Sequence, residues 1–111
     1  MAERNKHINQ RETNIRTIKL RGVPISISHQ KGTLIIWGKP EYRNRRIEIH
    51  GKDELDYEAT ANFVQYKNQY AAIFNRLPPG NYWLEAVDIA IHGYEKLTIT
   101  SNFATQLDWE D

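Results

Sequence analysis

The chain has 111 residues, of which 40% are hydrophobic and 26% are charged, so it is long and apolar enough for one folded domain. It contains no cysteine, which excludes disulfide bonds, a thiolate metal site and a cysteine nucleophile. The net charge is +1, yet residues 1–50 hold eleven Lys and Arg against four Asp and Glu, whereas residues 51–111 hold four against ten. This asymmetry fits a basic segment that meets a polyanion. It also fits two halves that pair across a sheet, the interpretation we favour.

Residues 1–14 contain almost no apolar side chains, and we expect them to form a flexible polar arm before a single domain at residues 15–111. No apolar run follows the first charges, so we expect neither a secretory signal nor a transmembrane helix. These features favour a cytoplasmic protein without a membrane partner.

From residue 15 onward, short β-rich runs alternate with turn residues. In the first half these runs are IRTIKL (15–20), ISIS (25–28), TLIIWG (33–38) and RRIEIHG (45–51). The five consecutive strand formers from Thr33 to Trp37 are typical of a strand that is buried on both faces or lies at the centre of a sheet. The last run alternates, which predicts that Ile47 and Ile49 point inward while Glu48 and His50 point outward.

The second half continues the pattern after an acidic segment, residues 52–59, which is either a loop or a short helical turn. Its runs are TANFVQY (60–66), YAAIF (70–74), YWLEAVDIAI (82–91), EKLTIT (95–100) and NFATQLDW (102–109). We expect the first two to form a hairpin that turns at residues 67–69. Strand-like runs recur every 8 to 12 residues without a helical period, which predicts an all-β, antiparallel, Ig-like (prealbumin-like) sandwich of about seven strands.

The stretch FNRLPPGNYWLEA (74–86) is either a binding loop or a corner between two strands. Pro79 fixes φ at the first turn position, and Gly80 supplies the positive φ that a type II turn requires at the next. We expect the Leu77 side chain to be buried at one end of the hydrophobic core. Tyr82 should point inward and Trp83 outward, because successive side chains of a strand alternate. The corner interpretation explains every residue except Trp83, and we favour it.

This stretch resembles the carboxypeptidase regulatory-like domains and their Cna B-type and transthyretin-like relatives. The similarity covers roughly residues 30–109 and is carried by Phe74-x-x-Leu77-Pro78-Pro79-Gly80-x-Tyr82-x-Leu84, by Gly93-Tyr94 and by the apolar alternation of the closing runs. The resemblance implies a β-sandwich. It implies little about function, because such domains are mostly accessory modules.

Aromatic and basic residues supply the candidate binding groups. An outward Trp83 can stack on a sugar or a base, or anchor a protein partner. Basic groups interleaved with aromatic ones can grip a nucleic acid and stack its bases. The candidates are Trp83, Tyr42 and Trp37, together with Arg43, Arg45 and Arg46 in the loop KPEYRNRR. Alternatively, this loop is an ordinary solvent-exposed surface, on which the aliphatic parts of the arginine side chains cover apolar groups.

Sequence motifs for metal or catalytic chemistry are absent. The four histidines form no His-x-His or His-Glu-x-x-His pair, and we expect no metal site at them and no cofactor. The acidic residues 53–58 lack the glycine and the ligand spacing of an EF-hand loop. They could bind calcium only weakly. No serine lies in a nucleophile motif. We therefore expect a protein that is not an enzyme.

The leading functional hypothesis is a non-catalytic module that binds a protein partner, or itself, through an exposed sheet face or edge. The alternative is carbohydrate binding through the exposed aromatic residues. A second alternative is the binding of nucleic acid or another polyanion through the basic first half of the chain.

Overall fold

The computed structural model describes residues 15–86 and 94–109, and within them the chain is all-β, as predicted. The strands are β1 (Ile15–Leu20), β2 (Val23–Ser28), β3 (Gly32–Gly38), β4 (Arg46–Gly51), β5 (Glu58–Asn62), β6 (Val64–Tyr66), β7 (Gln69–Leu77), β8 (Gly80–Ala86), β9 (Tyr94–Ile99) and β10 (Ala104–Asp108). One three-residue 3-10 helix, Pro40–Tyr42, follows β3. The predicted polar arm at residues 1–14 and the segment 87–93 lie outside the described residues.

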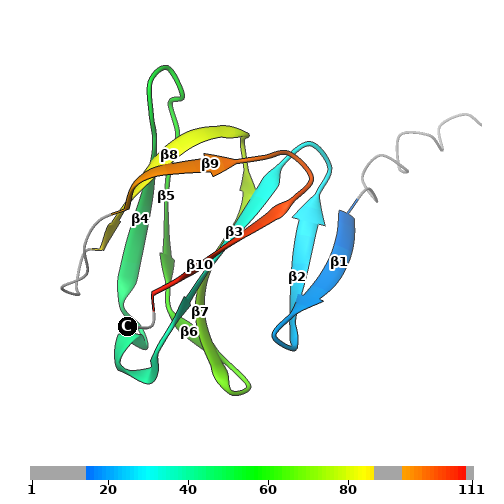
Figure 1. Ribbon diagram of the computed structural model, residues 1–111, viewed down its shortest axis with the longest axis vertical. Coiled ribbons are helices and arrows are strands. Elements are labelled where there is room, and N and C mark those ends of the chain that lie inside the picture. The colour runs from blue at the N-terminus through cyan, green and yellow to red at the C-terminus, as the bar shows by residue number, and fades with distance from the viewer. Residues whose placement is uncertain (1–14, 87–93, 110–111) are drawn as a thin grey trace, which may run out of the picture.

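The described strands form two four-stranded sheets and one two-stranded sheet. The four-stranded sheets have the orders β10-β3-β7-β6 and β5-β4-β8-β9, and β1 pairs with β2 alone. Neighbouring strands are antiparallel except β10, which runs parallel to β3. Figure 1 shows β3, β7 and β10 between the β1–β2 hairpin on one side and β4 and β5 on the other.

The main core lies between the two four-stranded sheets. Leu34 and Ile36 of β3 belong to the same buried cluster as Ile47 and Ile49 of β4, and all four side chains are inaccessible to solvent. The outward neighbours Glu48 and His50 confirm the predicted alternation of β4. Removing each such aliphatic side chain from water contributes about 1.5 to 3 kcal/mol, so this interface is a principal source of stability.

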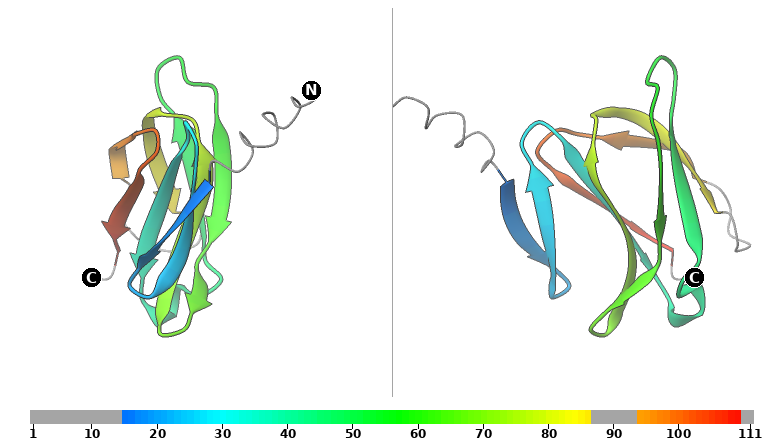
Figure 2. Two further views of the ribbon diagram at one scale, coloured as in Figure 1. Left: turned by 90° about the vertical axis from the view of Figure 1, so that its right-hand side faces the viewer. Right: turned by 180° about the vertical axis from the view of Figure 1, so that it is seen from behind.

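A second buried cluster lies on the other face of β3. Val23 and Ile25 of β2 pack there with Ile35 and Trp37 of β3. Figure 2 shows the β1–β2 hairpin as a separate layer beside the larger sheets. The central strand β3 is therefore covered on both faces, as its run of consecutive apolar residues predicted.

The segment 60–66 is not one strand, contrary to the sequence prediction. The chain leaves one four-stranded sheet at the end of β5 and enters the other at β6. Phe63 lies at the crossing point and is completely buried in the main core. This split, together with the separate β1–β2 hairpin, explains why the described residues contain ten strands instead of about seven. The hairpin turn after β6 is confirmed, and its positive φ falls on Lys67.

Residues 77–80 form a corner that carries the chain from β7 in one four-stranded sheet to β8 in the other. Leu77 is fully buried at the end of the core, and Gly80 has a φ of 149°, in the region that favours glycine. Tyr82 is buried and Trp83 lies on the opposite face of β8, as predicted. The corner interpretation of the Pro-Pro-Gly stretch is therefore confirmed. The φ of Gly80 differs, however, from the value of about +80° that the predicted type II turn has at this position.

One ion pair joins the basic first half of the chain to its last strand. The Arg21 guanidinium lies 2.6 Å from a carboxylate oxygen of Asp108 on β10. Arg16 also donates a hydrogen bond to the Asn102 carbonyl oxygen at 2.7 Å. The ion pair is of the kind expected if oppositely charged halves pair with each other.

Candidate functional site

The outer face of the β5-β4-β8-β9 sheet gathers one histidine, one tryptophan and three glutamates. Side chains alternate between the two faces of each strand, and residues opposite each other on paired strands share a face. Glu48 lies opposite Glu85, and His50 lies between Trp83 on one side and Glu58 on the other. We call these five residues the His50 cluster.

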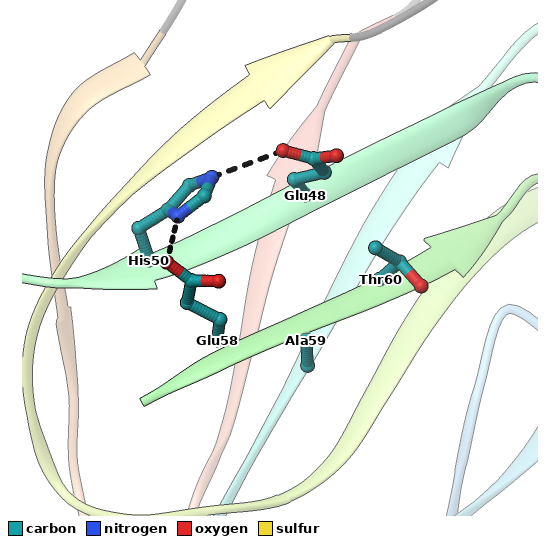
Figure 3. Close-up of a pocket in the computed structure, with 5 residues that line it drawn as sticks. All are labelled: Glu48, His50, Glu58, Ala59 and Thr60. Carbon is teal, nitrogen blue, oxygen red and sulfur yellow. Dashed lines mark hydrogen bonds and ion pairs between the residues drawn. The ribbon is translucent and has the colours of Figure 1, made fainter. Parts of the chain in front are cut away.

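The imidazole of His50 is the centre of this cluster. Its Nε2 atom lies 3.1 Å from Glu48 Oε1 and 3.7 Å from Glu85 Oε1, and its Nδ1 atom lies 3.3 Å from Glu58 Oε2. Figure 3 shows Glu48 and Glu58 directed at different nitrogens of the ring. Trp83 stacks on the same ring, with centroids 4.2 Å apart and planes inclined by 15°. The ring therefore has little freedom to rotate.

A pocket of about 260 Å³ opens beside this ring, between β4 and β5. Its lining residues are Glu48, His50, Glu58, Ala59 and Thr60 (Figure 3). The side chain of His50 is only 17% exposed, whereas that of Glu58 is 75% exposed. The pocket thus combines a sheltered imidazole with one solvent-facing carboxylate, that of Glu58.

The carboxylates of the His50 cluster favour a cation over an anion. Like charges directly opposite each other on neighbouring strands are destabilising, and Glu48 and Glu85 are such a pair. Nitrogen and oxygen atoms of Glu48, His50 and Glu85 lie within 4.8 Å of one another. Within the described ranges, no other three such residues converge in this way. The acidic stretch 53–58 does not form a group of its own, and Glu58 belongs to the His50 cluster instead.

Most of the groups around His50 come from other strands, so the sequence next to His50 does not predict them. The spacing Glu48-x-His50 on an alternating strand is the one sequence signal for the cluster, since it places both side chains on one face. The pairing of β4 with β8 places Glu85 beside these residues, and the pairing of β4 with β5 places Glu58 there. No His-x-His or His-Glu-x-x-His motif is involved, so a motif search misses this group.

The edge of the same sheet is formed by β5, which pairs only with β4 among the described strands. Two hydrogen bonds lie just beyond the ends of the β4–β5 pairing: Gly51 N donates to Tyr57 O, and Phe63 N donates to Arg45 O. They show which residues of β5 form hydrogen bonds with β4. In an antiparallel pair, hydrogen-bonded and non-hydrogen-bonded positions alternate. The backbone groups of Glu58, Thr60 and Asn62 therefore point away from β4, toward the open edge.

The predicted aromatic contact residues lie in different environments. Trp83 is half-buried on the outer face of the sheet, where His50 covers one side of its ring. Trp37 is completely buried under the β1–β2 hairpin, and its indole nitrogen donates to Gln106 Oε1 at 2.9 Å. Tyr42 is 9% exposed and packs against Phe63 in the core, with ring centroids 5.4 Å apart and planes tilted by 46°. The expectation that Trp37 and Tyr42 present free aromatic surface is therefore wrong, because both fill hydrophobic space.

The predicted basic residues remain on the surface. Arg43, Arg45 and Arg46 are all exposed, at the end of the loop that leads into β4. Neither Trp37 nor Tyr42 is available beside them for stacking on a base. Arg43 and Arg45 thus lie in the loop before β4 and Arg46 is the first residue of β4, whereas the aromatic groups expected to act with them are buried.

Neither a family model, a curated protein nor a solved structure matches this chain. In the part of the chain that the structure describes, no helix is long and apolar enough to cross a membrane.

Proposed function

We propose that this chain is a non-catalytic interaction module that binds an extended segment of a protein partner, or of a second copy, along the open edge of β5. The observation that carries this proposal is the outward direction of the backbone groups of Glu58, Thr60 and Asn62. An extended segment that pairs with an open edge gains main-chain hydrogen bonds, and its alternate side chains meet the outer face of the sheet. Here that face holds the His50 cluster.

The edge of β5 is less protected than the edges formed by β6 and β9. Natural sheets protect their edges with short strands, with Lys or Pro, or with irregular pairing. The edge strand β6 has three residues, and the pairing of β9 with β8 shifts register between Tyr82 and Leu84. By contrast, β5 pairs regularly over five residues, EATAN, and contains neither Lys nor Pro.

The direct test removes one outward N–H group. In Thr60→Pro the missing N–H is one that points away from β4, so the sheet keeps its own hydrogen bonds and the fold survives. The matched control, Thr60→Val, keeps the N–H and changes only the side chain. Peptides selected on the wild-type protein from a random twelve-residue library serve as probes, with affinity measured by calorimetry.

We expect Thr60→Pro to weaken the selected peptides by about tenfold, the equivalent of one hydrogen bond of about 1.4 kcal/mol, and Thr60→Val to bind as wild type. Bound peptide also slows hydrogen exchange at Glu58, Thr60 and Asn62. Equal affinity of both variants, with protection elsewhere, would rule out the β5 edge. Self-association through the same edge predicts a dimer that Thr60→Pro dissociates in sedimentation experiments.

Polyanion binding is a second candidate function, supported by the exposure of Arg43 and Arg45 in the loop before β4 and of Arg46 at the start of β4. Phosphate contacts release counterions, so affinity for DNA or heparin would fall steeply with salt. A triple Ala variant of these arginines should flatten that dependence. Binding that is unchanged between low and high salt would count against this candidate. Carbohydrate binding has less support, because His50 covers one face of Trp83 and the other aromatic candidates are buried.

We also infer that the fold is an Ig-like sandwich of the prealbumin type, as in the carboxypeptidase regulatory-like family. Two four-stranded sheets that share one core, and the Leu77–Gly80 corner between them, support this assignment. An experimental structure with a different strand order would refute it.

A further inference from the structure

We propose that Glu48, His50 and Glu85 bind a divalent first-row transition metal ion, with Zn²⁺ as the probe ion, and that Glu58 orients the histidine. The proposal concerns the outer face of the β5-β4-β8-β9 sheet and does not depend on partner binding at the β5 edge. It rests on the geometry of the imidazole, on the arrangement of the carboxylates around it and on the chemistry of the donors.

Both nitrogens of the His50 ring face carboxylate oxygens. A neutral imidazole has one N–H group, and its other nitrogen carries a lone pair. If Nδ1–H donates to Glu58 at 3.3 Å, the lone pair of Nε2 faces the Glu48 oxygen at 3.1 Å and the Glu85 oxygen at 3.7 Å. Three lone-pair donors that converge on one point repel one another unless a cation lies between them.

A metal ion satisfies this arrangement more completely than a proton. A proton on Nε2 can be shared with one carboxylate at a time, whereas a metal ion accepts all three donors at once. Ligands at about 2.0 to 2.1 Å from a tetrahedral zinc ion lie roughly 3.3 to 3.4 Å from one another. The two measured separations from Nε2, 3.1 and 3.7 Å, bracket that value.

Glu58 occupies the position of an outer partner to a metal-binding histidine. Such histidines almost always donate their second ring N–H to a carboxylate, a carbonyl oxygen or water, which fixes the tautomer and raises the basicity of the coordinating nitrogen. Glu58 lies 3.3 Å from Nδ1, and Trp83 stacks on the ring and holds its plane. The ligand nitrogen is therefore oriented before any metal arrives.

The donor set indicates the class of metal. One imidazole with two carboxylates suits zinc and neighbouring first-row ions better than calcium or magnesium, which prefer oxygen ligands only. Three protein ligands leave a fourth tetrahedral position. The Glu85 side chain is 55% exposed, so this position is open to water or to a donor group from another molecule.

The test is a Zn²⁺ titration of the full chain, followed by NMR signals of the His50 ring and by the midpoint of thermal unfolding. We expect saturable one-to-one binding that shifts the His50 ring signals and raises the unfolding temperature. Glu85→Gln, a conservative change at an exposed site, should weaken binding at least tenfold. Glu58→Gln should weaken it by about 10- to 100-fold without removing a ligand.

The controls separate this site from adventitious binding. Glu54→Gln, in the exposed acidic loop outside the cluster, and His29→Ala, on the surface turn after β2, should bind Zn²⁺ as wild type does. The proposal is overturned if 1 mM Zn²⁺, a concentration about tenfold above a Kd of roughly 100 μM, leaves the His50 ring signals unchanged. It is also overturned if Glu85→Gln binds as tightly as wild type. Because no partner is present, neither result bears on the β5 edge.

Discussion

The Tyr82 hydroxyl donates a hydrogen bond to the carbonyl oxygen of Pro78 at 2.5 Å, four residues earlier in the chain. This bond closes the corner at which the chain passes from β7 in one sheet to β8 in the other. The ring of Tyr82 is fully buried, and Tyr57 packs against it edge-on with centroids 6.2 Å apart. The Pro-Pro-Gly stretch is thus held from inside the core.

Replacing Tyr82 by Phe should lower the free energy of unfolding by about 1 to 2 kcal/mol, because it leaves the Pro78 carbonyl oxygen without its donor. Urea denaturation measures this loss. Tyr70→Phe, which removes the same atom from a half-buried position on β7, is the matched control and should change stability by less than about 0.5 kcal/mol. Equal losses of unfolding free energy in the two variants would show that the hydrogen bond from Tyr82 to Pro78 does not stabilise the fold.

Stability should also depend on Tyr82 at high pH. Burial raises the pKa of Tyr82 from 10.0 to about 12, and the neighbouring Tyr57 adds to the effect. Because the pKa is higher in the folded state, the unfolded chain loses its proton first. The stabilising contribution is therefore complete below pH 10 and is lost as the pH rises to about 12. The absorbance titration of wild type minus that of Tyr82→Phe should show one phenol ionising near pH 12. A difference step near pH 10 would contradict the burial argument.

Gly51 should tolerate substitution less well than Gly22. A Cβ atom at Gly51 would lie 2.2 Å from the Leu55 carbonyl oxygen, so the loop after β4 would have to move. At Gly22 the space is open, and the cost comes only from its φ of +78°. We expect Gly51→Ala to cost about 3 kcal/mol and Gly22→Ala about 1 kcal/mol in urea denaturation. A larger stability loss for Gly22→Ala than for Gly51→Ala would mean that the loop after β4 moves away from the added Cβ atom at little cost.

The two tryptophans should respond differently to truncation. Trp37 is buried between layers, with the Arg21 guanidinium 4.5 Å from its ring centroid, so Trp37→Ala should cost about 3 to 5 kcal/mol. Trp83 is half-buried on a sheet face and stacks only on His50, so Trp83→Ala should cost about 1 kcal/mol. Thermal and urea unfolding of both variants measure the contrast. Similar losses would contradict the different environments assigned to them.

Part of the candidate site could be predicted from local sequence. The alternation of RRIEIHG placed Glu48 and His50 on the outer face of a strand, and YWLEA placed Trp83 and Glu85 on the outer face of another. Sequence could not show that these two faces are neighbours. The pairing of β4 with β8 spans more than thirty residues of chain, and no local preference encodes it. The misjudged residues Trp37 and Tyr42 show the same limit, because an aromatic residue beside a basic loop looks the same whether or not another layer covers it.

The sequence by itself determined that the chain is all-β and which face of most strands is apolar, because side-chain alternation is a local property of extended backbone. It also indicated the corner at residues 77–80, because proline restricts the backbone at Pro79 and glycine accepts the positive φ found at Gly80. Tertiary structure alone decided the parallel pairing of β10 with β3, the crossing at Phe63 and the convergence of three glutamates on His50. Those features depend on register between strands distant in sequence, which is set by how the whole core packs.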